Sequence, residues 1–500
     1  MENEFRWTTA RALRELVARR SASPLEIVEA CLATIGELDP VLRAFITVAA
    51  DRAIDEARSA AEAVARGVPL GPLHGVPVAL KDEAWTADMP STAGSLIFKR
   101  FVPSRDGTVA ERLRRAGAII VGKANMPEFA AWPRSKNRIA GESVNPWDTR
   151  RISGASSGGS AAAVVAGMVP LAVGSDGGGS IRIPSALCGA VGLYPSPGRV
   201  PSYGSFSYTP AGSMGPMGRD VADVALMQQV IAGPDSRDAS AMTEEAPEVL
   251  AGLDSGVEGL RAVWSSDFGR IPVDSRVAAV AAEALMELSR AGVSIEETEA
   301  VLEHPWGDAA AITADQDAVA AAGWPTEVPY DETDIPDLSA EEEWMWEVFS
   351  DTVPFTASES FQQLRARYVP LLTPPAQVAA RGPAPAAAAP PPSAESLRRA
   401  MEAVLSDRDV LCSPTMAVTA PVAPEGWGTA YADGYMGTNF TFIANALGCA
   451  AISVPCGLVD GLPVGLQFIG RPGDEAKVLR FARALEVIRP FPTLRHHTDA

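Results

Sequence analysis

The sequence predicts an α/β fold in which helices cover a mostly parallel or mixed β-sheet. Between residues 66 and 215, short apolar runs alternate with helical segments and glycine-rich turns, a pattern typical of βα units. Two more strand-like runs, at 450–458 and 463–471, return near the end of the chain. Because strands occur in both halves, we expect one sheet and therefore one domain over residues 1–500.

The first 65 residues predict helices. Ser23 and Glu26 form a capping-box pair around Pro24, and proline suits the first position of a helix. The apolar residues that follow share one helical face: Ile27, Val28, Cys31, Leu32 and Ile35. In the core region 66–215, strands are predicted from the apolar runs 76–80, 118–122 and 169–174.

The second half of the chain has a less regular pattern. We expect an amphipathic helix at 275–291 followed by a strand, a hairpin turn at 459–461 and a final helix at 474–488. Segment 300–400 is rich in alanine, tryptophan and acid, and its stretch 381–395 predicts an exposed extended loop. Residues 401–500 are expected to complete the same sheet.

The composition indicates a globular protein that does not bind polyanions. Hydrophobic residues make up 47% of the 500 residues and charged residues 21%. The formal net charge of −20 argues against nucleic acid or an anionic membrane as a main partner, since both bind basic surfaces. No secretory signal and no long apolar run is visible, so we expect a cytoplasmic protein without membrane spans.

Cysteine and histidine usage narrows the chemistry. The five cysteines form no C-x-x-C pair, which fits a reducing compartment. Of the four histidines, His496 and His497 lie in the terminal tail, whereas a catalytic zinc usually needs two or three well-placed ones. We therefore expect no metal and no cofactor. A Ser-His-Asp triad would have to use His74 or His304.

Two Gly/Ser clusters carry the clearest chemical signal. They are GASSGGS at 154–160 and SDGGGS at 175–180, with an Ala/Val helix and a short strand between them. Ser180 follows Gly177, Gly178 and Gly179, whose backbone N–H groups can turn towards one point and form an oxyanion hole. Such clusters also form flexible turns or phosphate-binding loops, but the G-K-[ST] ending of a P-loop is absent.

A serine nucleophile needs a base, and Lys81 is the candidate. It ends the apolar run 76–80, where burial would favour the neutral amine. A neutral lysine accepts a proton, and Ser156 could relay that proton between Ser180 and Lys81. The alternative for Lys81 is a salt bridge with an acid such as Asp82.

Four stretches of the chain resemble the amidase signature family of Ser-Ser-Lys hydrolases. They are GPLHGVPVALKD, GKANMPEFA, SGASSGGSAAAVVAGMVPLAVGSDGGGSIRIPSALCGAVGL and AISVPCGLVDGLPVGLQFIGRPGDEAKVLRFARALE, in the family's order. The resemblance implies a single α/β/α domain with a large mixed sheet and with residues 66–215 as its signature core. It also implies amide-bond hydrolysis without a metal or cofactor.

The resemblance assigns a role to each residue of the predicted triad. It implies that Lys81 is the base, that Ser156 is the bridging serine and is preceded by a cis peptide bond, and that Ser180 is the nucleophile. The backbone amides of Gly177, Gly178 and Gly179 are implied as oxyanion donors.

Three supporting residues are also implied by the resemblance. Ser157 matches a hydroxyl beside the triad, and Asp176 and Arg182 match an ion pair that flanks the nucleophile. The chain departs from the usual pattern at Ala155 and Tyr194, where the family usually has glycine and lysine, and at Gly177, where it usually has threonine.

The resulting expectation is an amidase that cuts the C–N bond of neutral, bulky or aryl amides through an acyl-Ser180 intermediate. The same triad would serve a carbamate (urethane) or ester hydrolase, so the substrate is a small amide, carbamate or ester. Family members also act as the glutaminase subunit of a tRNA-dependent amidotransferase, which would require a partner protein. A catalytically inactive binding module is disfavoured because all three polar triad residues are present. The sequence leaves a homodimer open.

Segment 300–400, which lies outside the family motifs, is expected to act as a cap over the Ser180 site. Between residues 327 and 347 it has nine acids and no Lys or Arg. Aromatic side chains commonly line pockets, and acids on the rim would repel anionic substrates. The alternative is a packed helical layer with a solvated acidic face. The segment contains four tryptophans: Trp306, Trp324, Trp344 and Trp346.

Overall fold

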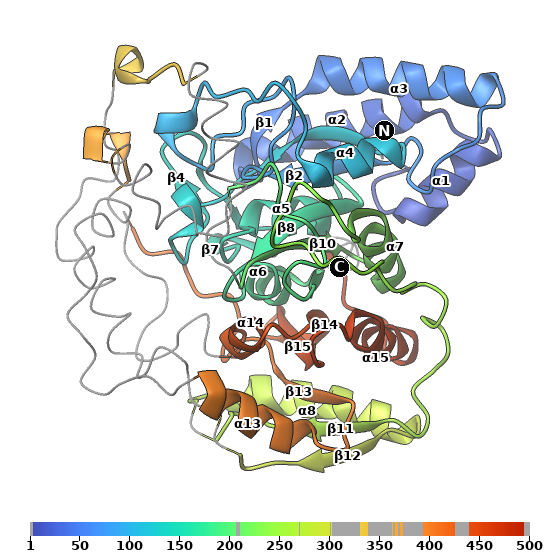
Figure 1. Cartoon of the computed structure of the whole chain (residues 1–500), viewed down its shortest axis with the longest axis vertical. Coiled ribbons are helices and arrows are strands. Elements are labelled where there is room, and N and C mark those ends of the chain that lie inside the picture. Colours follow the sequence, from blue (N-terminus) through green and yellow to red (C-terminus); the bar gives the residue numbers. More distant parts are fainter. Residues whose placement is uncertain are drawn as a thin grey trace.

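The computed structural model describes residues 4–206, 211–269, 271–300, 302, 331–338, 363, 366–368, 371–373, 394–425 and 440–494. Its centre is an 11-stranded mixed sheet in the order β1-β3-β2-β8-β10-β9-β14-β15-β13-β11-β12. In Figure 1 the sheet extends from β1 near the top to β12 at the bottom. Strands from both halves of the chain therefore share one sheet, and the predicted α/β/α fold with a large mixed sheet is confirmed.

The large sheet contains both parallel and antiparallel neighbours, with a run of antiparallel pairs from β8 to β13 in its middle. The pairs β2–β3, β2–β8, β11–β12 and β11–β13 are parallel, and the other neighbours are antiparallel. In chain order the strands are β1 (Phe45–Val48), β2 (Pro77–Lys81), β3 (Ile119–Ala124), β8 (Leu171–Asp176), β9 (Val191–Tyr194), β10 (Ser213–Gly218), β11 (Arg261–Trp264), β12 (Ser294–Glu297), β13 (Val410–Pro414), β14 (Ala451–Val459) and β15 (Leu462–Ile469).

Two short hairpins lie outside the large sheet, and helices cover both of its faces. The hairpins are β4 (Lys136–Asn137) with β5 (Gly141–Glu142), and β6 (Val144–Asn145) with β7 (Asp148–Ile152). The α-helices are α1 (Ala10–Ala18), α2 (Pro24–Leu42), α3 (Ala50–Ala65), α4 (Thr108–Arg115), α5 (Gly158–Val165), α6 (Arg182–Cys188), α7 (Val221–Ile231), α8 (Ser275–Arg290), α13 (Ala394–Leu405), α14 (Phe442–Leu447) and α15 (Glu475–Ile488). Short 3₁₀ turns are η1 (Leu96–Phe98), η2 (Glu128–Ala130) and η3 (Glu332–Asp334).

The N-terminal helices begin where the sequence predicts. Ser23 caps α2, Glu26 completes the capping box and Pro24 is the first helical residue. The region 8–65 is not helical throughout, however, because the four-residue strand β1 separates α2 from α3 and pairs with β3. So short a strand between two helices has too few residues to show a period-two pattern.

The predicted strands and late helices are present with small shifts at their ends. The runs 76–80, 118–122 and 169–174 correspond to β2, β3 and β8, and the helices at 275–291 and 474–488 to α8 and α15. The predicted hairpin joins β14 and β15 through Asp460 and Gly461, which both have positive φ angles. The extended loop predicted at 381–395 lies outside the described residues except for 394 and 395, which begin α13.

Alternating side chains of the central strands pack on opposite faces of the sheet. Val78 and Leu80 of β2 join one apolar cluster with residues of α1 and α4, whereas Ala79 joins another with residues of α2, α3 and α5. Lys81 follows the same alternation, so its side chain leaves the sheet on the face that α5 covers.

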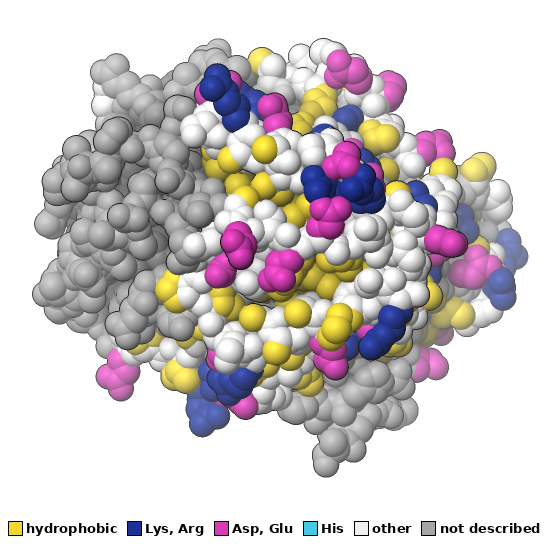
Figure 2. All heavy atoms as spheres, turned by 90° about the horizontal axis from the view of Figure 1, so that it is seen from below, with side chains coloured by type: hydrophobic (Ala, Val, Ile, Leu, Met, Phe, Trp, Pro, Cys, Tyr) yellow, Lys and Arg dark blue, Asp and Glu magenta, His cyan; other side chains and the backbone are white. Residues whose placement is uncertain are grey.

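Charges of both signs are mixed on the surface at the lower end of the molecule. Figure 2 shows acidic and basic side chains side by side on this face, without a broad area of one sign among the described residues. Exposed ion pairs of the strands and helix at this end include Arg261 with Glu296 (3.1 Å) and Arg276 with Asp460 (2.6 Å).

Candidate active site

Lys81 stands at the carboxyl end of β2 and is completely buried. Its Nζ lies 2.7 Å from Ser156 Oγ and 2.7 Å from Ser175 Oγ. Burial lowers the pKa of Lys81, while the nearby carboxylates of Glu83 and Asp176 act to raise it. The lysine therefore has a greater tendency to be neutral than a solvated lysine, as its apolar strand predicts.

The acid beside Lys81 is Glu83, so the suggested salt bridge with Asp82 is wrong. Glu83 Oε1 lies 3.6 Å from Lys81 Nζ, and both side chains are buried. The Asp82 carboxylate instead accepts hydrogen bonds from the backbone N–H groups of Thr92 (3.1 Å) and Gly94 (3.2 Å). Residues 82 and 83 form a turn directly after β2, closed by the N–H of Ala84 donating to the carbonyl of Lys81 (3.0 Å), and this turn places Glu83 rather than Asp82 beside Lys81.

Ser156 lies on the loop between β7 and α5. The peptide bond between Ala155 and Ser156 is cis, as the family resemblance implies. Ser135 supports this loop: its hydroxyl donates to the carbonyl of Gly154 (2.9 Å) and accepts from the N–H of Gly158 (3.0 Å). Gly158 is needed here because a Cβ would approach within 2.4 Å of Ser153 Oγ and 2.5 Å of Ser135 Oγ.

Ser180 lies on the loop between β8 and α6 and is half-buried. Its hydroxyl makes no hydrogen bond to another described residue, and neither do the N–H groups of Gly177 and Gly178. Gly179, with φ of +128°, donates its N–H to Asp176 Oδ1 at 2.6 Å. Of the three N–H groups predicted as oxyanion donors, those of Gly177 and Gly178 thus remain available among the described residues, whereas that of Gly179 is used within the loop.

A buried ion pair fixes the base of the Ser180 loop. Arg182 Nε lies 2.9 Å from Asp176 Oδ2, and neither side chain is exposed. Burial acts to raise the pKa of Asp176, but the Arg182 charge and several hydrogen bonds outweigh it and hold that pKa below its usual range. Arg182 also donates to the carbonyl of Thr441 (2.8 Å) and to Asn445 Oδ1 (2.6 Å), so the pair connects this loop to α14.

Tyr194, where the family usually has lysine, packs against the same arginine. The Arg182 guanidinium carbon is 4.9 Å from the centre of the Tyr194 ring, and the phenol donates to the carbonyl of Ala211 (2.7 Å). The tyrosine thus adds an aromatic contact to the ion pair without adding a second positive charge.

Ser157 joins the two catalytic loops. Its N–H donates to the carbonyl of Ser180 (3.1 Å), while its hydroxyl donates to the carbonyl of Ser175 (3.1 Å) and accepts from the N–H of Ser175 (3.2 Å). These contacts connect the Ser156 loop with β8 and with the Ser180 loop.

Ser175 is a site residue that the sequence reasoning missed. It lies in β8, the parallel neighbour of β2, and the carboxyl ends of parallel strands meet at one edge of a sheet. A polar residue near the end of β8 was the available signal. The pairing that places it 2.7 Å from Lys81 depends on the strand order, which the sequence does not give directly.

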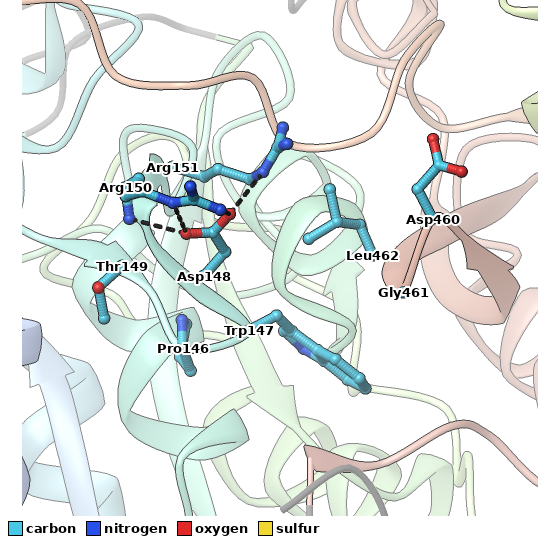
Figure 3. Close-up of a pocket in the computed structure, with 9 residues that line it drawn as sticks. All are labelled: Pro146, Trp147, Asp148, Thr149, Arg150, Arg151, Asp460, Gly461 and Leu462. Atoms are coloured by element: carbon cyan, nitrogen blue, oxygen red, sulfur yellow. Dashed lines mark hydrogen bonds and ion pairs between the residues drawn. The ribbon is translucent and has the colours of Figure 1, made fainter.

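A separate hollow of about 570 Å³ lies between β7 and the β14–β15 turn. Figure 3 shows that Asp148 faces both Arg150 and Arg151, with nitrogen–oxygen distances of 2.9 and 3.0 Å. None of the triad residues lines this hollow, and its arginines are occupied by Asp148. Its nine lining residues are Pro146, Trp147, Asp148, Thr149, Arg150, Arg151, Asp460, Gly461 and Leu462.

Two surveys of the described residues bear on other classes of site. They contain no group of three or more His, Cys, Asp or Glu side chains arranged to hold a metal ion. No helix among them combines the length and the apolar character that crossing a bilayer requires.

Comparison with known proteins identifies the family. The model of the family described as "Amidase" matches residues 26–479. The chain belongs to the amidase signature family. As a member, it is an amide-bond hydrolase by class, and members of known structure share its fold.

Both relatives and solved structures match nearly the whole chain. A glutamyl-tRNA(Gln) amidotransferase subunit of Symbiobacterium thermophilum is 37% identical, covering 98% of this amidase and 97% of that protein. A bacterial aryl acylamidase of the family has a TM-score of 0.75 at 28% identity, covering 97% of each chain. The corresponding amidotransferase subunit of Thermotoga maritima has a TM-score of 0.71 at 30% identity, covering 98% of each chain.

Proposed function

We propose that this chain hydrolyses small carboxamides through an acyl-enzyme on Ser180, with Lys81 as the base and Ser156 as the proton bridge. The observation that carries the proposal is the 2.7 Å contact between Lys81 Nζ and Ser156 Oγ in a buried site joined to the Ser180 loop by Ser157. A buried lysine whose pKa is lowered can accept a proton, and a serine hydroxyl within hydrogen-bond distance can deliver it.

Acylation follows from this arrangement. The Ser180 Oγ attacks the carbonyl carbon while its proton passes to Ser156 Oγ, and the Ser156 proton passes to Lys81 Nζ. The carbonyl π-electron pair moves to the oxygen, where the free N–H groups of Gly177 and Gly178 stabilise the negative charge. When the C–N bond breaks, the proton returns from Lys81 through Ser156 to the leaving nitrogen. A water molecule then attacks the ester of Ser180 and gives its proton to Lys81 through Ser156. The C–O bond to Ser180 breaks, Ser180 recovers a proton by the same path, and the carboxylic acid is released.

The substrate class that we propose is a neutral, bulky or aryl amide. Four apolar residues of segment 300–400 pack beside the loop that follows Lys81, in one cluster that is rich in aromatic side chains. The similarity to an aryl acylamidase supports the same class. The cluster includes Trp85, Phe98, Phe101, Phe129 and Phe206 from the first half of the chain, with Ile335, Leu338, Leu371 and Leu372 from the segment.

The tryptophans of segment 300–400, which lie outside the described residues, provide the test of this specificity. If the segment caps the site, at least one of Trp306→Ala, Trp324→Ala, Trp344→Ala and Trp346→Ala should change the ratio of kcat/KM for an anilide to that for an alkyl amide, because aromatic contacts discriminate by shape. Ser180 should still label normally in that variant. A set in which every change lowers only the thermal stability, with the substrate ranking intact, would exclude the cap.

A second candidate is the glutaminase subunit of an amidotransferase, which the 37% identical relatives favour. The two candidates differ in their need for a partner. We expect the purified chain alone to hydrolyse simple amides, measured as product release from a panel of anilides, primary amides, esters and carbamates. Turnover of glutamine or asparagine only, and only with a partner protein present, would favour the second candidate instead. Faster turnover of carbamates or esters than of any amide would shift the proposal to a carbamate or ester hydrolase.

A further inference from the structure

The Glu83 side chain is a buried acid that the relay described above does not use. It is 1% exposed, and neither of its carboxylate oxygens accepts a hydrogen bond from the described residues. Burying a carboxylate without partners is costly, so such a group is retained only where a charge compensates it. Among the described residues, the positive group that pairs with it is Lys81, whose Nζ lies 3.6 Å from Glu83 Oε1.

The surroundings of Lys81 Nζ match its protonated form. Three oxygens lie around this nitrogen: Ser156 Oγ and Ser175 Oγ at 2.7 Å each, and Glu83 Oε1 at 3.6 Å. An ammonium group has three N–H donors, whereas a neutral amine has two and a lone pair. When the Ser156 proton reaches Lys81, the lone pair that faced Ser156 becomes a third N–H, so each of the three oxygens faces a donor and the Glu83 carboxylate lies beside a full positive charge.

We propose that Glu83 is a positioning residue that stabilises the Lys81 ammonium formed during acylation, an inference that rests on the proposed function. Glu83 takes no part in the proton relay itself. Its negative charge compensates the positive charge of Lys81 while the acyl carbon carries the oxyanion, and Lys81 then returns its proton to the leaving nitrogen. In this respect Glu83 resembles the aspartate of a Ser-His-Asp triad, which stabilises the cation of the base.

The other charged groups near Lys81 and Glu83 have partners of their own. Asp176, the second acid that acts on Lys81, is paired with Arg182. Lys123 is the other cation near Glu83, and it donates to the Ala84 carbonyl, to Ser91 Oγ (2.8 Å) and to Thr86 Oγ1 (3.3 Å). Its three donors are thus used. The remaining charged groups that act on Lys123 are Asp82, Asp106 and Arg114.

The test is the pH dependence of kcat/KM and kcat in Glu83→Gln. Glutamine keeps the shape but removes the charge that favours protonated Lys81. The acid limb, which is the fall in activity on the low-pH side of the profile, should therefore move to lower pH. We expect a shift of about 1–3 pH units, the usual effect of removing an opposite charge a few ångströms away. On the alkaline plateau kcat should fall about 10²-fold, because the ammonium loses its counter-charge in the transition state. Glu83→Asp moves the charge one methylene away and should give a smaller shift in the same direction.

Glu475→Gln is the matched control, because Glu475 is equally buried but faces Arg199 instead of Lys81. The acid limb of this variant should coincide with that of the wild type. An unmoved acid limb together with an unchanged kcat in Glu83→Gln overturns the proposal. If Glu83→Gln does not fold by circular dichroism, an unmoved limb in Glu83→Asp overturns it alone. Failure of the proposed function looks different, since wild-type Ser180 would then not react with a fluorophosphonate.

Discussion

Ser180→Ala is expected to lose about 10⁶-fold in kcat, the scale of removing a serine nucleophile that acts together with its base. The loss follows because Ser180 is the proposed nucleophile, next to the N–H groups of Gly177 and Gly178, which make no hydrogen bond to another described residue. Amide turnover at saturating substrate measures the loss. A fluorophosphonate or sulfonyl fluoride should also label the wild-type chain at Ser180 and fail to label the variant.

Ser160→Ala is the control for this prediction. Ser160 is a buried serine of the neighbouring Gly/Ser cluster whose hydroxyl donates to the carbonyl of Val173 (3.0 Å). Its removal should leave labelling of Ser180 intact. A peptide map that finds the label on Ser156 or Ser175 instead would show that the nucleophile has been misassigned.

Lys81→Ala is expected to lower kcat/KM by at least about 10²- to 10⁴-fold, the usual contribution of a general base. In the wild type the neutral amine is the active form, so activity should fall as the pH drops through the Lys81 pKa in the free enzyme. Because burial lowers that pKa below its ordinary value, the enzyme should remain active well below about pH 10.4, where a solvated lysine is half-protonated. A pH series of kcat/KM measures both effects.

Lys81→Arg separates the chemical role of Lys81 from a structural one. Arginine keeps the positive charge and the hydrogen-bond donors but does not lose its proton in proteins. It should therefore be as inactive as Lys81→Ala. Recovery of activity in Lys81→Arg would mean that Lys81 serves only as a fixed charge, and an acid limb that persists unchanged in Lys81→Ala would mean that another group titrates.

Much of this site could be predicted because its residues lie in unusual local contexts. A lysine at the end of an apolar strand and a serine after three glycines are conspicuous in a single sequence, and the structure places Lys81 beside Ser156 as the relay requires. The resemblance to a known family then added the cis peptide bond and the Asp176–Arg182 pair, both of which the structure contains.

The rest depends on which segments become neighbours. Ser175 reaches Lys81 only because β8 lies beside β2, and a strand order cannot be read from the composition of either strand. Whether Asp82 or Glu83 faces Lys81 depends on the conformation of the turn that follows β2, and the sequence-based suggestion selected the wrong acid. The engagement of the Gly179 N–H by Asp176 likewise follows from the path of the loop, not from its glycine content.

The contacts of Arg182 have a consequence for how the enzyme is made. This arginine of the signature core donates hydrogen bonds to Thr441, Asn445 and Gln467 from the last part of the chain. Synthesis proceeds from the N-terminus, so Lys81, Ser156 and Ser180 all leave the ribosome long before these partners exist. We therefore expect the nascent chain to have no hydrolytic activity until its C-terminal strands emerge. Truncated products that stop before Gln467 should likewise not hydrolyse cellular amides.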